Sequence, residues 1–167
     1  MKLVGSDITA INAHTNLDCA EGGVNDTLAE RLALTDVSVI GSENLLRAGH
    51  FDSSLPAFLA HIKAKLGCEG LRYVDGGKPV SKVAVGGGSC GSALQEVIDA
   101  GCDTFVTADV KYNQFWDAKV HGINLIDAGH FQTENPVCAV LAGKLQKAFP
   151  EIRVILSKSH QDCMKFY

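Results

Sequence analysis

The sequence lacks two features that would assign it to a large class of proteins. No apolar run approaches the roughly 20 residues that a membrane span needs, and there is no cationic excess. The 15 Lys and Arg residues stand against 19 Asp and Glu residues, for a net charge of -4. Nucleic-acid-binding surfaces are usually strongly basic. The composition therefore argues against a membrane protein and against a nucleic-acid partner.

Paired cysteines are also missing. The six cysteines form no C-x-x-C pair, which excludes a zinc knuckle or a thioredoxin-like motif. The first residues lack the long apolar stretch of a signal peptide, so we expect a cytoplasmic protein with reduced thiols. Most of the cysteines are expected to be small buried hydrophobes. Cys90 is the exception, because it follows a glycine-rich turn before a helix, where a thiol pKa can fall.

The length and the hydrophobic content of the chain predict a folded domain. The chain has 167 residues and 46% hydrophobic residues, which suits one domain or two small ones. Short apolar runs alternate with helical patterns from residue 82 onward. Strands are expected at 83–85, 104–107, 123–126 and 153–156, and helices after Ser92, at 114–120 and from about Thr133. This alternation is typical of βαβ units. We therefore predict a layered α/β fold with a mainly parallel or mixed sheet.

Individual helices carry further expectations. Ser92 and Gln95 form a capping-box pattern for the first of them. The last helix has a stripe expected to be buried, made of Val137, Val140, Leu141 and Leu145. The first half of the chain is less regular. We expect a strand at 8–11, a helix at 27–34, a loop at 35–53, a strong helix at 54–66 and a strand at 71–74.

Polar residues follow the ends of several predicted strands. His14 and Asp18 follow 8–11, Asp109 and Lys111 follow 104–107, and His130 and Glu134 follow 123–126. Ligands of open α/β sheets bind beyond the carboxyl ends of the strands. These residues are therefore the first candidates for a functional site.

Two of these pairs suit a metal ion. Imidazole and carboxylate groups bind zinc, iron or manganese, and His130 with Glu134 has the same spacing as His14 with Asp18. Thr133 and Pro136 place the expected helix start between His130 and Glu134, with the histidine on the loop. In the alternative interpretation, Glu134 only complements the helix dipole and His130 caps a turn.

The glycine-rich segment supports a rival hypothesis. Gly86, Gly88 and Gly91 match G-x-G-x-x-G between a predicted strand and a predicted helix, and Asp109 lies where a ribose-binding acid would. Glycine amides and a helix N-terminus can hold a pyrophosphate. However, a tight strand-to-helix turn needs glycine in any case, so both interpretations stay open at this point.

Several blocks together resemble a known family. The H-T-N-L-D of residues 14–18 and the E-G-G-V-N-D of residues 21–26 are similar to signature blocks of the Nif-three-like proteins, often labelled "GTP cyclohydrolase 1 type 2 homologue". Residues 85–92, 107–112 and 127–134 resemble the other blocks in the same order. On this comparison the glycine segment becomes a turn that lines a crevice.

The resemblance implies a Nif-three-like fold with a two-metal site between two α/β domains, in a ring-shaped homo-oligomer, typically a hexamer. Its implied metal ligands are Asp18, His130 and Glu134. His14, Asp109 and Lys111 are expected near the metal or facing the substrate. The family also carries an upstream pair of adjacent histidines, and this sequence has no His-His. Asn113 stands where many members have histidine after the Lys-Tyr pair.

We therefore expect the C-terminal portion of a Nif-three-like protein, with an incomplete site that binds metal weakly. Residues 1–34 would belong to the metal-site domain, 35–81 to a connecting region, and 82–157 to the βαβ-rich part with the other ligands. The expected function is metal-dependent hydrolysis of a nucleotide or phosphoester, with Lys111 and the amides of residues 87–89 near an anionic substrate. The alternatives are a non-catalytic metal-binding regulatory protein and a nucleotide-binding module that uses the segment Gly86–Gly91.

Overall fold

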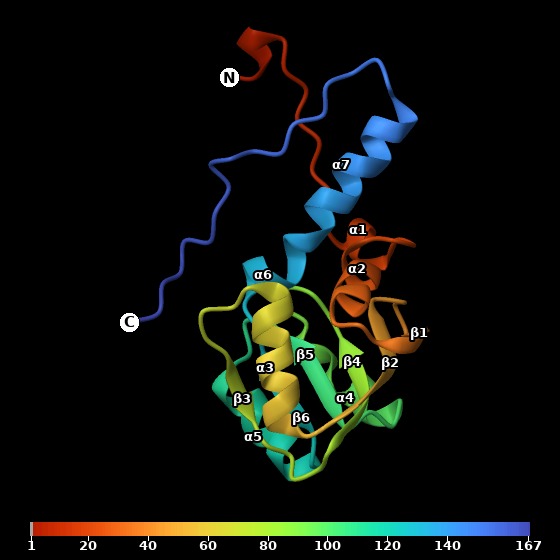
Figure 1. Cartoon of the computed structure of the whole chain (residues 1–167), viewed down its shortest axis with the longest axis vertical. Helices are drawn as coiled ribbons and strands as arrows, with labels where there is room; N and C mark the ends of the chain where they lie inside the picture. The colour runs from red at the N-terminus through yellow and green to blue at the C-terminus, as the bar shows by residue number, and fades with distance from the viewer. Residues whose placement is uncertain (1) are drawn as a thin grey trace.

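The computed structural model describes residues 2–167 and contains a six-stranded mixed sheet in the order β1-β2-β4-β5-β6-β3 (Figure 1). Its centre is parallel: β4 (Val80–Val85), β5 (Thr104–Thr107) and β6 (Asn124–Asp127). The outer strands are antiparallel, with β2 (Leu46–Ser53) beside β4, β1 (Thr35–Ile40) beside β2 and β3 (Arg72–Val74) beside β6. The predicted α/β fold with a mixed sheet is confirmed.

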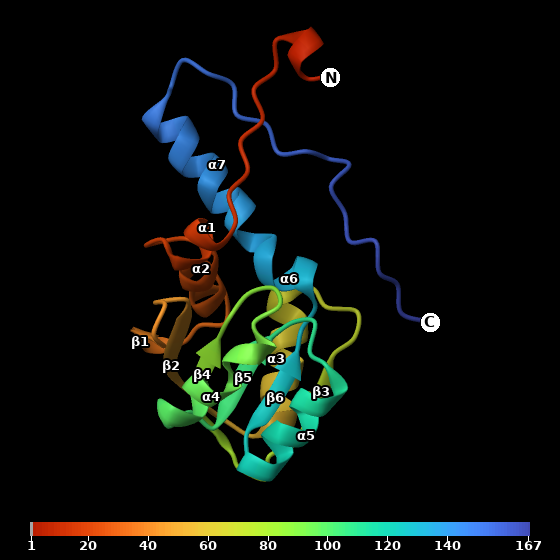
Figure 2. The same cartoon turned by 180° about the vertical axis from the view of Figure 1, so that it is seen from behind.

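Helices cover both faces of the central strands (Figures 1 and 2). Phe58 and Ile62 of α3 (Leu55–Leu66) pack on one face, with Val83 and Val85 of β4. Ala84 points to the opposite face, where α4 (Leu94–Asp99) and α5 (Tyr112–His121) pack. Successive side chains of a strand alternate between faces. Because both faces are covered, each central strand has a short buried apolar segment on successive residues, at 83–85, 105–106 and 125–126.

The helix predicted at 54–66 is confirmed as α3, because its signals are local. Pro56 lies in its first turn, and Gly67 ends it in a left-handed conformation with φ 70°. Proline suits the first turn since its missing N–H has no intrahelical partner there, and glycine adopts positive φ without a Cβ clash. Its apolar face then packs on the sheet.

The remaining helices lie beyond the carboxyl ends of β4, β5 and β6. They are α1 (Thr15–Cys19), α2 (Val24–Arg31), α6 (His130–Glu134) and α7 (Pro136–Ala148). Two short 3-10 turns complete the list, η1 (Val4–Ser6) and η2 (Gly91–Ala93). Figure 1 shows α7 running away from the sheet beside the N-terminal segment. Across residues 2–167, no helix combines the length and apolar character that crossing a membrane requires.

Two predicted strands are wrong. Residues 8–11 and 153–156 are extended but belong to no strand, and Ile11 and Ile155 are 90% and 67% exposed. A strand needs a neighbour to bond its backbone groups, and in the described part of the chain no strand lies beside either segment. The predicted loop at 35–53 is also wrong, since it forms β1 and β2. β1 was missed because it is an exposed edge strand, with little apolar pattern.

Several helix details also differ from the expectations. The helix predicted at 27–34 is α2 and begins three residues earlier, at Val24. The capping box at Ser92 is absent, because η2 precedes α4 and the N-cap of α4 is Ala93. The predicted helix near Thr133 is divided into α6 and α7 at Asn135. Of its expected stripe only Val137 is buried, while Leu141 and Leu145 are 36% and 39% exposed.

Candidate metal centre

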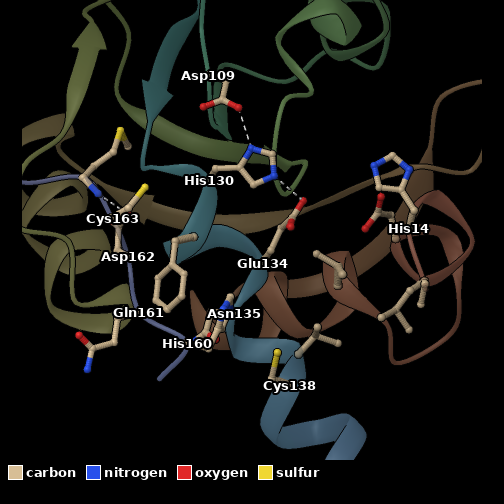
Figure 3. Close-up of a pocket in the computed structure, with 17 residues that line it drawn as sticks. His14, Asp109, His130, Glu134, Asn135, Cys138, His160, Gln161, Asp162 and Cys163 are labelled. Atoms are coloured by element: carbon tan, nitrogen blue, oxygen red, sulfur yellow. Dashed lines mark hydrogen bonds and ion pairs between the residues drawn. The ribbon is translucent and has the colours of Figure 1, made fainter. Parts of the chain in front are cut away.

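A pocket of about 540 Å³ lies where α1, α6 and the start of α7 meet beyond the ends of β5 and β6. Five of the six residues singled out from the sequence line it, namely His14, Asp18, Asp109, His130 and Glu134 (Figure 3). Lys111 is not among the lining residues. The expectation that polar residues after separate strands converge is therefore met for five of the six.

His130 and Glu134 come together because both lie on α6. The helix begins at His130 itself, so the expected loop position of this histidine is wrong. Residues four apart share one face of a helix, and Nε2 of His130 lies 3.1 Å from Oε1 of Glu134. Gly129, with φ 88°, allows the sharp turn from β6 into this helix.

Asp109 orients the ring of His130. Oδ2 of Asp109 lies 2.6 Å from Nδ1 of His130, and Figure 3 shows the chain of contacts from Asp109 through the imidazole to Glu134. This hydrogen bond is the main reason that the pKa of His130 is raised, and the negative charge of Glu134 adds to it against the opposing effect of burial. A neutral ring that donates from Nδ1 leaves the Nε2 lone pair facing Glu134.

Asp18 brings a second carboxylate to the pocket from α1. Burial raises the pKa of Asp18, and repulsion from Glu134 raises it further, while His14 and His130 lower it. Two carboxylates and an imidazole thus face a shared, partly desolvated space. A divalent cation would neutralise such a group of donors.

His130 and Glu134 are spaced to share one metal ion, whereas Asp18 is not close enough to act as the third ligand. Two ligand atoms bonded to one ion at about 2.0–2.2 Å lie roughly 2.8–3.6 Å apart, for angles between octahedral and tetrahedral. Nε2 of His130 and Oε1 of Glu134 are 3.1 Å apart. Within residues 2–167, no group of three His, Cys, Asp or Glu side chains is close enough to form a ready metal site. Asp18 shares the pocket, without completing such a group.

Gly88 forms the floor beneath the two aligned donors. A Cβ on Gly88 would lie 2.3 Å from Oε1 of Glu134 and 3.1 Å from Nε2 of His130, and the residue has φ +63°. Any side chain here would displace the donor atoms. The backbone of the turn therefore lies directly against both donors, and only glycine leaves them where they are.

The hydrogen bonds of the turn Gly86–Gly91 argue against the phosphate-loop hypothesis. The amide of Gly87 donates to Oδ1 of Asn25 at 2.7 Å, and the amide of Gly88 donates to Oγ1 of Thr133 at 3.0 Å. These donors are satisfied within the protein, so they are not free for a pyrophosphate or an anionic substrate. Asp109, the proposed ribose-binding acid, holds His130 instead.

Asn25 and Thr133 were not identified from the sequence. They are 0% and 1% exposed, and their partners are distant in sequence, so no local spacing reveals the contacts. Both lie inside the blocks 21–26 and 127–134 that carry the family resemblance. A buried polar residue must find hydrogen-bond partners, and here those partners are at the site.

Cys90 does not have the environment of a reactive thiol. Burial raises the pKa of Cys90 to about 11, and Asp18 and Glu134 add to the increase. Its Sγ donates to the carbonyl of Gly87 at 3.2 Å. The expected lowering of its pKa is wrong, because the thiol is enclosed and faces negative charge.

The C-terminal segment supplies one wall of the pocket. Residues 160–164 line it, the ring of His160 lies 5.1 Å from that of Phe131, and Asp162 accepts a hydrogen bond from Gln132 at 2.7 Å. Figure 3 shows His160 and Asp162 on this wall, across from His14. The sequence carried no signal for this contact, since it depends on how the tail folds back.

The comparisons with known proteins agree with the arrangement of these blocks. The family model described as Duf34/NIF3 (NGG1p interacting factor 3) matches residues 1–163. The chain belongs to the Duf34/NIF3 family. One similar solved structure is that of Staphylococcus aureus hypothetical protein SA1388, with a TM-score of 0.88 and 27% identity, which covers 99% of this chain and 71% of that chain. Another is that of a Bacillus cereus protein related to NIF3, with a TM-score of 0.85 and 22% identity, which covers 99% of this chain and 75% of that chain.

Curated Duf34/NIF3 relatives carry one recurring name. A "GTP cyclohydrolase 1 type 2 homolog" from Nostoc is 35% identical over 96% of this chain and 64% of its own length. The protein of that name from Clostridium perfringens is 31% identical over 99% of this chain and 67% of its own length. The chain thus spans about two thirds of the length of these relatives. The family resemblance inferred from the sequence blocks is confirmed.

Proposed function

We propose that this chain binds a divalent metal ion (zinc, iron or manganese) through His130, Glu134 and Asp18. The observation that carries the proposal is the 3.1 Å approach of Nε2 of His130 to Oε1 of Glu134, above a glycine whose Cβ would collide with the carboxylate oxygen. Membership of the Duf34/NIF3 family supports the choice of site. The proposed binding is weak, because no third donor is in place among residues 2–167.

The protein's own groups prepare this site for a cation. Asp109 holds the Nδ1 side of His130, so that Nε2 presents its lone pair to the pocket. Asp18 contributes a negative charge that burial and the nearby Glu134 carboxylate make costly in the absence of a cation. When bound, a divalent ion supplies Lewis acidity that acidifies water and polarises a bond under attack.

We further propose that the bound ion serves hydrolysis of a nucleotide or phosphoester. A pocket of about 540 Å³ falls in the range of small-molecule sites, which is about 300–1,000 Å³. The names of the curated relatives favour a guanine nucleotide as the first substrate to test. The homo-oligomer implied by the family resemblance, a hexamer in the intact proteins, is part of the same proposal.

The first experiment measures metal binding. The purified chain is stripped with a chelator and titrated with Zn²⁺, Mn²⁺ and Fe²⁺ by calorimetry. Glu134→Gln and His130→Ala should weaken binding at least tenfold, whereas Glu151→Gln and His121→Ala should not, since these exposed residues lie outside the pocket. Absence of metal binding by the wild-type chain would exclude both the hydrolase and the non-catalytic metal-binding protein.

The second experiment separates those two functions. The metal-loaded chain is assayed for hydrolysis of GTP and of simple phosphoesters, with Asp18→Ala as the inactive control. Turnover that requires Asp18 supports the hydrolase. Stoichiometric metal binding without turnover of any of these substrates would instead favour the regulatory alternative. Light scattering of the same samples tests the proposed oligomer.

A further inference from the structure

The glycine turn Gly86–Gly91 contacts α6, which carries His130 and Glu134, and α2, which follows the α1 helix that carries Asp18. One amide of the turn, that of Gly87, donates to Oδ1 of Asn25 on α2 at 2.7 Å. The next amide, that of Gly88, donates to Oγ1 of Thr133 on α6 at 3.0 Å. Two consecutive peptide groups therefore connect two helices that are more than 100 residues apart in the sequence.

Asn25 extends the first connection to Asp18. Its side chain is fully buried, and Nδ2 lies 3.4 Å from the carbonyl oxygen of Asp18 and 2.7 Å from that of Leu45. The amide group thus uses both its acceptor and its donor. Asn25 therefore bonds both to the turn, at Gly87, and to the backbone of the ligand residue Asp18.

Thr133 makes the second connection, to the other two ligands. Its hydroxyl is buried and lies 2.9 Å from the carbonyl oxygen of Gly129 and 3.0 Å from that of His130. It can therefore accept from Gly88 while donating to the first turn of α6. Thr133 precedes Glu134 and follows His130 by three residues. Its bond with the Gly88 amide therefore holds the helix segment that carries both donors against the turn.

The turn itself is held firmly by β5. The carbonyl of Gly88 accepts from the amide of Ala108 at 2.9 Å and from Oγ1 of Thr107 at 3.0 Å, and the amide of Gly86 donates to the carbonyl of Val106 at 3.0 Å. The turn is therefore fixed to the central sheet and lies between α2 and α6. The hydrogen bonds to Asn25 and Thr133 are the direct connections from the turn to the ligands.

We infer that Asn25 and Thr133 are positioning residues, which set the separation of Asp18 from the His130–Glu134 pair through the amides of Gly87 and Gly88. The inference rests on the proposed function, because the ligand for which the donors are spaced is a divalent cation. Metal affinity depends on how well the protein holds its donors in place before binding. Loss of either connection should therefore weaken metal binding, beyond the effect of an equally destabilising substitution elsewhere in the fold.

The chain contains a matched pair of control residues at the opposite end of the sheet. Asn124 is fully buried, accepts from the amide of Gly76 at 2.9 Å and donates to the carbonyl of Lys78 at 3.1 Å. Thr104 is also fully buried, and its hydroxyl donates to Asp103 and accepts from Asn124. These residues have the same chemistry and burial as Asn25 and Thr133, but they lie at the amino ends of β5 and β6.

The experiment compares Thr133→Val with Thr104→Val, and Asn25→Ala with Asn124→Ala. Zn²⁺ affinity is measured by calorimetry, and thermal unfolding is measured in chelator. We expect Thr133→Val and Asn25→Ala to weaken Zn²⁺ binding about 10- to 100-fold, as loss of groups that support metal ligands usually does. Thr104→Val and Asn124→Ala should lower the melting temperature comparably while leaving Zn²⁺ affinity within twofold of wild type.

Thr133→Ser is the rescue variant, because it keeps the hydroxyl and should retain wild-type affinity. If Asn25→Ala does not fold, the threonine series still decides the question. Equal Zn²⁺ affinities in Thr133→Val and Thr104→Val would overturn the positioning role and leave the metal site standing. Failure of the wild-type chain to bind Zn²⁺ would instead overturn the proposed function, and the positioning role with it.

Discussion

Replacing Gly88 with alanine places one methyl group at the floor of the candidate metal centre. Its Cβ would lie 2.3 Å from Oε1 of Glu134 and 3.1 Å from Nε2 of His130. Ordinary van der Waals contact begins near 3.4 Å, so the carboxylate oxygen must move by about 1 Å. The side chain of Glu134 is 38% exposed and can rotate toward solvent to make this space.

The expected cost divides into two parts. The first is conformational, since Gly88 has φ +63° and a left-handed L-residue costs about 1–2 kcal/mol. For a domain of this size that corresponds to a melting temperature about 2–8 °C lower. The second part concerns the metal alone. Once the Glu134 carboxylate has moved, it and His130 can no longer bind the same ion. Zn²⁺ affinity should then fall at least tenfold, or about 1.4 kcal/mol.

Gly101 provides the control for the first part. It has φ +69°, and a Cβ there would meet no atom within 4 Å. Gly101→Ala should therefore show the same conformational cost without any change in metal affinity. Thermal unfolding in chelator and calorimetric Zn²⁺ titration of both variants separate the two effects. The reasoning is refuted if Gly88→Ala binds Zn²⁺ as tightly as Gly101→Ala.

Three further predictions concern single side chains. Cys90, with a pKa of about 11, should resist iodoacetamide at about pH 8 in the native chain and react after unfolding in urea; mass spectrometry would contradict this if native labelling were equally fast. The hydrogen bond that Nδ1 of His130 donates to Asp109 raises the pKa of His130 above the usual value of about 6.5. In metal-free protein this bond therefore stabilises the fold fully below that pH, and the stabilisation is lost as pH rises through the folded-state pKa. Asp109→Asn should accordingly cost more stability at about pH 5.5 than at about pH 8.5, and an equal loss at both would count against the pairing. Arg47 is 3% exposed and pairs with Asp26, which is 29% exposed. Because Asp26 keeps contact with water, Arg47→Met should lower the free energy of unfolding in urea titrations by about 2–3 kcal/mol, less than the roughly 3–5 kcal/mol of a fully buried pair. A loss below about 0.5 kcal/mol, within the usual range of surface substitutions, would show that the pair contributes little.

The parts of the fold that the sequence predicted well depend on local signals. α3 was found because Pro56, Gly67 and an apolar face mark it within a few residues. The strands β4, β5 and β6 were found because burial on both faces gives each of them a short apolar segment of successive residues. The edge strand β1 was missed, since an exposed strand needs no such pattern.

The two failed strands have a different cause. Residues 8–11 and 153–156 contain β-forming residues, which is why they were predicted. A strand forms only when another strand bonds its backbone, and the described part of the chain provides no neighbour for either segment. Propensity is a property of the residues themselves, whereas pairing is a property of the whole sheet.

The sequence by itself determined the order of strands and helices from β4 to β6. It also singled out five residues that line one pocket, namely His14, Asp18, Asp109, His130 and Glu134. It could do so because periodicity, turn residues and polar residues after strand ends are all visible within short windows. Tertiary structure alone decided what the glycine turn does. The spacing was compatible with a phosphate loop as well as with a plain strand-to-helix turn, but the amides of residues 87 and 88 donate to side chains 62 and 45 residues away. Which groups satisfy those amides depends on how distant segments pack, and that information is not present in any local window.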